Sequence, residues 1–124
     1  MTQNGTQEPF ASELRLNPQK SELSITFTDG TAGRLSAELL RVISPSAEVQ
    51  GHSPSERKLV PGKRDVTIRA IEPVGNYAVR LVFSDGHNTG LYSWLYLHEI
   101  AHRKEELWNG YLQELAAAGA SRDR

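Results

Sequence analysis

The sequence feature that most constrains the fold is an internal repeat that aligns without a gap. The segment ITFTDGTAGRLSAELLR (25–41) matches LVFSDGHNTGLYSWLYL (81–97) in its apolar positions and in its Asp-Gly pair. Each copy contains an alternating apolar strand, the Asp-Gly pair, a short second strand and a serine. Asp-Gly is a strong signal for a tight hairpin, and Ser36 and Ser93 are suitable helix N-caps. The repeat therefore predicts a β-hairpin followed by a helix, used twice.

Alternating apolar residues predict further strands around the repeat. We expect residues 13–16 to pair with 23–28, and residues 64–74 to pair with 77–83 across a Gly-Asn turn. Strands joined by short turns are typical of antiparallel sheets. We therefore expect an α+β fold: an antiparallel, hairpin-built β-sheet with a short helix after the first hairpin and one or two C-terminal helices packed on the sheet.

The period of the apolar residues becomes helical from Ser93 onward. We expect this helix to break near 102–104 and to end at Gly119. Residues 1–12 and 120–124 are polar, so we expect a disordered N-terminal tail and a flexible C-terminal tail. Residues 13–119 then form a single domain, which is long enough to bury one core.

Composition narrows the function classes. The 124 residues carry a formal net charge of −1 and contain no cysteine. A near-neutral chain gives no support to a nucleic-acid or anionic-membrane partner, and the absence of thiols excludes disulfides, thiolate metal sites and a cysteine nucleophile within this chain. The N-terminus lacks the features of a signal peptide, and no stretch approaches the ~20 apolar residues of a membrane span. We expect a soluble cytoplasmic protein.

Two histidines match a zinc-peptidase motif. LHEIAH contains His98, Glu99 and His102 in an H-E-x-x-H spacing, which places two imidazoles one helical turn apart with a general base beside them. A catalytic zinc needs a third protein ligand, and the extended form of the motif is absent. We therefore favour a half-exposed amphipathic helix in which His102 pairs with Glu106. A metallopeptidase stays a remote alternative.

The segment 43–63 has no apolar period and is rich in proline, glycine and serine. A loop of this length in a compact domain is usually functional or disordered. Its Ser44, Glu48 and His52 include the residue types of nucleophilic catalysis, but no G-x-S-x-G elbow accompanies them. We favour a loop whose serines satisfy backbone groups.

The second Asp-Gly turn carries His87 directly after it. We expect this imidazole at an exposed hairpin tip, where it is a candidate metal ligand or hydrogen-bonding group. Tyr92 follows in the next strand, and its amphipathic ring suits either the core or a recognition surface.

Three stretches together resemble a known family: LLRVISPSAEVQGH, PGKRDVTIRAIEPVGNYAVRLVFSDGHNTGLYSWLYL and LWNGYLQEL. They are similar to the gamma-butyrobetaine hydroxylase-like N-terminal domain, over residues 12–120. The resemblance implies a domain that occurs alone in bacteria. It also implies a domain that precedes the oxygenase domain of gamma-butyrobetaine and trimethyllysine dioxygenases, and that is fused to P-loop ATPases of iron–sulfur cluster assembly.

The resemblance also implies a zinc site in the dioxygenases, with three cysteines spaced C-x-C-x-x-C and the histidine of an Asp-Gly-His turn. Carried over, the cysteine positions fall on Ser44, Ser46 and Val49, and the histidine is His87. Serine hydroxyls are poor zinc ligands and valine offers no donor. We expect the zinc site to be lost, and we expect no dioxygenase activity without the oxygenase domain.

We therefore expect a non-catalytic binding or adaptor module rather than an enzyme. We expect no cofactor, with zinc or iron at His87 as the alternative, and an unknown protein partner for which an iron–sulfur assembly factor is one candidate. A metal-binding or iron–sulfur cluster assembly accessory protein is the alternative function. The expected binding surface comprises Arg41, Ser44, Ser46, Glu48, His52, Asn76, Asp85, His87 and Tyr92.

Overall fold

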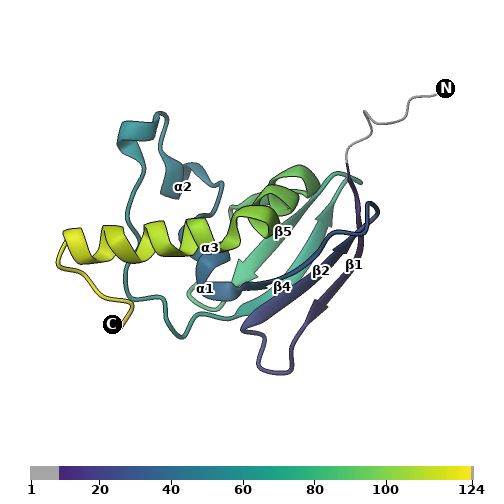
Figure 1. The fold of residues 1–124 in the computed structure, drawn as a ribbon, viewed down its shortest axis with the longest axis horizontal. Helices are drawn as coiled ribbons and strands as arrows, with labels where there is room; N and C mark the ends of the chain where they lie inside the picture. The colour runs from purple at the N-terminus through teal and green to yellow at the C-terminus, as the bar shows by residue number, and fades with distance from the viewer. Residues whose placement is uncertain (1–8, 124) are drawn as a thin grey trace.

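Residues 9–123 are described by a computed structural model, which contains six strands and three α-helices (Figure 1). The strands form two antiparallel sheets, in the orders β1-β2-β3 and β4-β5-β6. This arrangement confirms the predicted α+β fold, with two small sheets in place of one. The elements in chain order are β1 (Ala11–Leu16), β2 (Glu22–Phe27), β3 (Ala32–Ser36), α1 (Ala37–Val42), α2 (Ala47–Gln50), a 3₁₀ turn (Pro54–Glu56), β4 (Ile68–Val74), β5 (Ala78–Phe83), β6 (Leu91–Ser93) and α3 (Trp94–Ala117).

The predicted repeat is a structural repeat in element order, with β2–β3–α1 followed by β5–β6–α3. The alignment without a gap holds only through the turn, because Ser36 follows Gly30 by six residues and Ser93 follows Gly86 by seven. Gly30 and Gly86 both have a positive φ, of 89° and 92°, which a glycine adopts without a steric penalty. In the first turn Asp29 Oδ1 accepts a hydrogen bond from the Thr31 N–H at 2.9 Å, and in the second Asp85 Oδ1 accepts from the His87 N–H at 3.0 Å.

Both serines that end the repeats cap a helix, as predicted. Ser36 accepts a hydrogen bond from the Leu39 N–H, and Ser93 accepts one from the Tyr96 N–H, each at 3.0 Å. These bonds satisfy one of the amide groups that a helix leaves unpaired at its start. Strand, turn, strand and cap are therefore encoded twice by the same local chemistry.

The two sheets and α3 share one core. Alternate residues of β2 and β5 point into it, and α3 contributes residues three or four positions apart. Tyr77, at the start of the predicted strand 77–83, is 56% exposed because β5 begins one residue later, after the turn. The buried apolar residues of these three elements are Leu23, Ile25, Phe27, Ala78, Val79, Leu81, Phe83, Leu97, Ile100, Tyr111 and Leu115.

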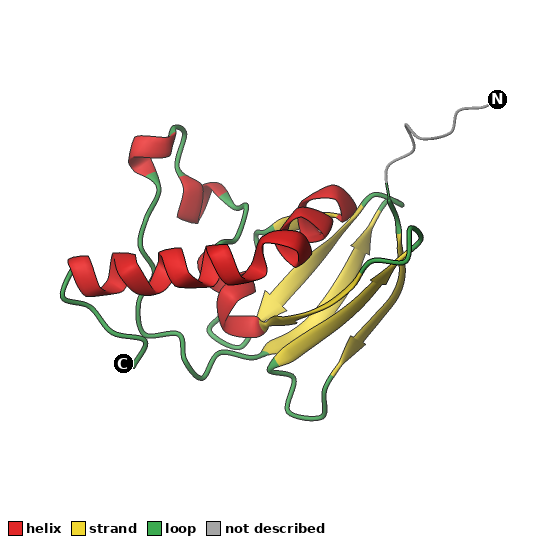
Figure 2. Cartoon of the chain, in the orientation of Figure 1, coloured by secondary structure: helices red, strands yellow, loops and turns green. Residues whose placement is uncertain are grey.

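Helix α3 bends at Arg103, within the predicted break. Its N-terminal half lies against the strands, whereas its C-terminal half extends beyond them toward the 44–63 segment (Figure 2). There the Tyr111 hydroxyl donates to the Val60 carbonyl at 2.8 Å. The helix ends at Ala117, two residues before Gly119. Among residues 9–123, no helix is both long and apolar enough to cross a membrane.

Two predicted boundaries were wrong. Strand β1 begins at Ala11, inside the predicted N-terminal tail, because it pairs with β2; residues 1–8 of that tail lie outside the described residues. The segment 120–123 was predicted to be flexible, but it is docked on the domain. The Gly62 N–H donates to the Ser121 carbonyl at 2.9 Å, and the Arg64 N–H donates to the Arg122 carbonyl at 3.1 Å.

Candidate functional site

Two segments that are about 40 residues apart in sequence meet in a partly buried polar cluster, which we call the joint. Ser44 Oγ lies 2.9 Å from His87 Nε2, and Ser46 Oγ lies 2.6 Å from Thr89 Oγ1. Glu48 Oε1 lies 3.1 Å from His87 Nδ1. These five residues therefore connect the start of the 44–63 segment to the second Asp-Gly turn.

The hydrogen-bond partners determine which atoms of the joint carry protons. Ser44 Oγ accepts from the Ser46 N–H at 3.2 Å, so its own hydrogen is free to be donated to His87 Nε2. The Glu48 carboxylate can only accept, so His87 Nδ1 must carry the proton that it shares with Glu48. Burial lowers the pKa of His87, and the nearby Arg41 guanidinium lowers it further. We infer a neutral imidazole with its proton on Nδ1.

Close packing accompanies these hydrogen bonds. Gly90 lies so near Ser44 that a Cβ atom there would be 2.5 Å from Ser44 Oγ and 3.1 Å from the ring of Tyr92. The side-chain amide of Gln50 donates to the Ser44 carbonyl at 2.8 Å. Ser44 is fully buried, and His87 is 7% exposed. Ser44, Ser46 and His87 therefore belong to the interior of the domain, whereas Glu48 and Thr89 lie at the exposed edge of the joint.

Asp85 extends this connection to a third segment. Its Oδ2 atom lies 2.8 Å from Arg41 Nε and 2.7 Å from Lys63 Nζ, and all three side chains are mostly buried. Burial alone raises the pKa of Asp85, but the hydrogen bonds from Lys63, the His87 N–H and Arg41 outweigh it, and the pKa falls to about 2. Asp85 is therefore a carboxylate that cross-links α1, the loop before β4 and the turn after β5.

The structure brings together most of the predicted binding-surface residues, but it places several of them inside. His87 was expected at an exposed tip and is buried, because the 44–51 segment covers the turn. Tyr92 is also buried, and its hydroxyl donates to the Leu40 carbonyl at 2.5 Å. Ser44 and Ser46 are buried as well, so the surface placement of these four residues was wrong.

Two predicted surface residues lie apart from the joint. The backbone N–H of His52 donates to Glu56 Oε1 at 2.7 Å, beside the exposed 3₁₀ turn. Asn76 lies in the β4–β5 turn, where its carbonyl accepts from the indole N–H of Trp94 at 3.0 Å. Neither residue is hydrogen-bonded to the joint.

The four residues at the family's implied zinc positions do not fit a zinc ion. Val49 is 2% exposed and has no donor atom. Both ring nitrogens of His87 are engaged, one by Ser44 and the other by Glu48. Neutral hydroxyls are weak ligands for zinc. In this chain, hydrogen bonds connect the 44–49 segment to the second Asp-Gly turn, which are the two segments that the implied zinc site would connect.

The H-E-x-x-H residues form other contacts. His98 Nε2 lies 2.8 Å from Asp29 Oδ2, and Glu99 pairs with Arg103. The expected pair between His102 and Glu106 was wrong, because Glu106 pairs with Arg103 instead. Within the described chain, no three histidine, aspartate or glutamate side chains are placed to hold one metal ion.

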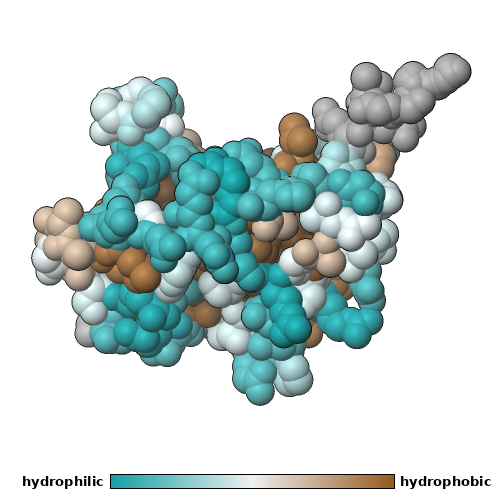
Figure 3. Space-filling model, in the orientation of Figure 1, coloured by the Kyte–Doolittle hydropathy of each residue, from teal (hydrophilic) through white to brown (hydrophobic). Residues whose placement is uncertain are grey.

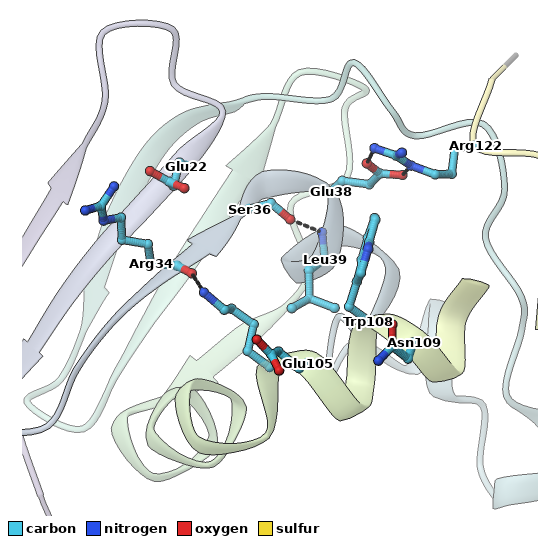
Figure 4. A pocket seen from close by; sticks show the side chains of 10 residues that line it. Glu22, Arg34, Ser36, Glu38, Leu39, Glu105, Trp108, Asn109 and Arg122 are labelled. Carbon is cyan, nitrogen blue, oxygen red and sulfur yellow. Dashed lines mark hydrogen bonds and ion pairs between the residues drawn. The ribbon is translucent and has the colours of Figure 1, made fainter. Parts of the chain in front are cut away.

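Sequence reasoning missed a second feature, a cavity of about 480 Å³ between β3, α1 and the middle of α3 (Figure 4). Glu38 is only 5% exposed, and its carboxylate accepts two hydrogen bonds from Arg122, at 2.7 and 2.8 Å. The Arg122 guanidinium also lies 5.0 Å from the centre of the Trp108 ring. No sequence pattern connects residues 84 positions apart, and Arg122 belongs to the segment that was predicted to be a flexible tail.

Comparisons with known proteins give one family and several solved structures. A family model described as "Gamma-butyrobetaine hydroxylase-like, N-terminal" matches residues 14–98. One NMR solution structure is 49% identical to the chain with a TM-score of 0.80, and the match covers 98% of this chain and 91% of that one. A second NMR solution structure is 47% identical with a TM-score of 0.79, and the match covers 92% of this chain and 90% of that one.

A crystal structure of a protein of unknown function from Acidithiobacillus ferrooxidans, assigned to the DUF971 family, is 37% identical to the chain with a TM-score of 0.61. The match covers 73% of this chain and 91% of that one. No curated protein matches the sequence.

Proposed function

Because the chain belongs to the gamma-butyrobetaine hydroxylase-like N-terminal domain family, we propose that it is a non-catalytic binding module whose joint supports a protein-recognition surface. One observation carries this proposal: Ser44 and His87, the side chains of the joint with reactive chemistry, are buried and hydrogen-bonded to each other. Buried side chains whose hydrogen bonds are satisfied make the domain rigid at that point, and they hold the neighbouring surface residues in one arrangement.

The joint has the order of groups that serine hydrolases use, since Ser44, His87 and Glu48 form a hydrogen-bonded chain. A nucleophile must also reach a carbonyl carbon, and its site must present donors to the oxyanion that forms. Ser44 is fully buried, and the N–H of Ser46 is directed at Ser44 Oγ itself. We therefore assign this chain of hydrogen bonds to structure.

The proposed recognition surface is the exposed rim of the joint. It consists of Ala47 and Glu48 on α2 and of Gly86, Asn88 and Thr89 on the turn. The joint holds these two groups of residues in one relative position, which limits the entropy lost on binding a partner. The face of the molecule seen in Figure 3 is mostly hydrophilic, with its hydrophobic side chains in small patches.

We propose a protein as the partner, in the cytoplasm, and an iron–sulfur assembly factor is the candidate that the family's fusions suggest. We propose no nucleic-acid or membrane ligand, given the near-neutral charge. We also propose no resident cofactor, because Val49 offers no donor atom and the ring nitrogens of His87 are engaged. A role in metal delivery would then depend on ligands of the partner.

Affinity purification from the native cytoplasm tests this proposal. The test variant is Ala47→Arg with Asn88→Arg, which adds bulk at two exposed positions of the rim. The matched control is Gln19→Arg with Ala116→Arg, two exposed positions on other elements. We expect the wild type and the control to retain the same partner and the rim variant to lose it.

Two results would contradict the proposal. One is a rim variant that retains every partner of the wild type. The other is covalent labelling of Ser44 by a fluorophosphonate in the folded wild-type protein, because this reagent reports an accessible, activated serine. Ser44→Ala is the control for the labelling experiment.

A further inference from the structure

We propose that the cavity beside α1 is a recognition site for an arginine side chain of a partner protein, and that the chain's own Arg122 occupies it in the absence of that partner. This site uses different residues from the joint and its rim. Its test is therefore independent of the function proposed above.

The site has the two features that recognise a guanidinium. Glu38 provides a buried carboxylate that accepts two parallel N–H···O bonds, which is the planar geometry that arginine matches and lysine does not. Trp108 provides an aromatic face 5.0 Å from the guanidinium carbon, a distance at which a cation is attracted to the ring. Figure 4 shows the Arg122 guanidinium paired with the Glu38 carboxylate and the Trp108 ring close to this pair.

The occupant comes from a segment with a limited number of anchors. Two backbone hydrogen bonds, at Gly62 and Arg64, hold residues 121–122. An exposed ion pair between Arg64 and Asp123 adds little, because pairs of this kind contribute only ~0–1 kcal/mol. The Arg122 side chain is 29% exposed, whereas Glu38 is 5% exposed. The segment can therefore leave while the carboxylate stays in place as a component of the domain.

Departure of Arg122 would change the charge of the cavity. Its lining contains the carboxylates of Glu22, Glu38 and Glu105 and the cations Arg34, Lys104 and Arg122. Without Arg122, three carboxylates face two cations, and the buried Glu38 carboxylate has lost its partner. Because an unpaired buried charge is costly, the open cavity should bind a guanidinium from another molecule.

Titration of an Arg122→Ala variant with N-acetyl-L-arginine amide tests the site. The readout is the indole N–H signal of Trp108 in a ¹H–¹⁵N NMR spectrum, and Trp94, which lies in another part of the fold, is the internal control. We expect a saturable shift of the Trp108 signal with a dissociation constant of about 1 mM. The Trp94 signal should stay in place.

Three comparisons sharpen the result. The wild type should show no shift, because a tethered arginine competes at an effective concentration on the order of mM or above. Arg64→Ala, which breaks the neighbouring exposed pair but retains Arg122, should also show none. N-acetyl-L-lysine amide should bind Arg122→Ala at least ~10-fold more weakly, since an ammonium cannot form the bidentate contact.

The proposal is overturned if folded Arg122→Ala gives no saturable Trp108 shift, or if adding Glu38→Gln to that variant leaves the affinity unchanged. Should Arg122→Ala not fold, Arg122→Met retains an aliphatic stem over Trp108 and serves for the same titration. If the site binds free arginine, 20 mM probe, about 20 times the expected dissociation constant, should stabilise the folded form of either variant. The proposal is therefore also overturned if neither variant folds at this probe concentration.

Discussion

Ser44 is the residue on which the joint depends most. Its hydroxyl accepts from the Ser46 N–H and contacts His87 Nε2, and all of these atoms are buried. Ser44→Ala leaves a buried donor and a buried acceptor without partners, a change that typically costs about 1–3 kcal/mol. We expect a loss of this size in the free energy of unfolding, measured by urea denaturation.

Ser55→Ala is the matched control for this prediction. Ser55 is exposed and its hydroxyl contacts only the neighbouring Ser53 hydroxyl, at 3.0 Å, so its loss should stay within ~0.5 kcal/mol. If Ser44→Ala were as stable as Ser55→Ala, the hydrogen bonds of the joint would not support the domain.

At the scale of elements, the space at Gly90 determines how closely β6 approaches the 44–51 segment. A Cβ atom at Gly90 would lie 2.5 Å from Ser44 Oγ, so one of the two segments would have to move. We expect Gly90→Ala to cost about 1–3 kcal/mol, the usual range for overpacking. Thermal or urea unfolding measures it.

Gly110 in α3 offers the opposite control, because nothing lies within 4 Å of a Cβ atom there. Gly110→Ala should raise the free energy of unfolding by about 0.5–1 kcal/mol, since alanine favours a helix. Equal effects of the two substitutions would show that close packing at Gly90 does not hold β6 against this segment.

Most strands, turns and helix starts were predictable, because the sequence patterns that specify them are local. Asp-Gly turns, serine caps and alternating apolar residues each act over a few positions, and the two repeats form as expected. The contacts of His87 and Arg122 were not predictable, because they depend on segments about 40 and 84 positions away. A histidine at a hairpin tip is exposed unless another segment covers it, and no local pattern reports that covering segment.

At the scale of the whole molecule, Asp85 connects three segments through one carboxylate. Its pKa in the folded protein is about 2, below its ordinary value of 3.8. A lowered pKa means that the stabilisation is fully present above about pH 4 and is lost as the pH falls through the folded value. We expect Asp85→Asn to be less stable than the wild type at pH 7.

The stability difference between wild type and Asp85→Asn should then shrink between about pH 4 and pH 2, as urea denaturation at a series of pH values would measure. Asp123→Asn is the contrasting control: the hydrogen bond from Arg64 also lowers the pKa of the Asp123 carboxyl, but this pair is exposed, so screening by solvent should leave its stability difference small at every pH. A difference that stays constant over this range would mean that Asp85 does not titrate as the contacts with Arg41 and Lys63 require.

We interpret the joint as a structural connection rather than a reactive or metal centre, and the protonation of the His87 imidazole distinguishes these two interpretations. Long-range ¹H–¹⁵N NMR of ¹⁵N-labelled protein distinguishes the two ring nitrogens and their protonation. We expect a neutral ring protonated on Nδ1 at pH 7. Because the pKa of His87 is lowered, the ring should still be neutral when the pH falls just below 6.5, the ordinary pKa of histidine. One equivalent of Zn²⁺ should leave its signals unchanged. A ring protonated on Nε2, or a His87 signal that shifts stoichiometrically with Zn²⁺, would contradict the claim.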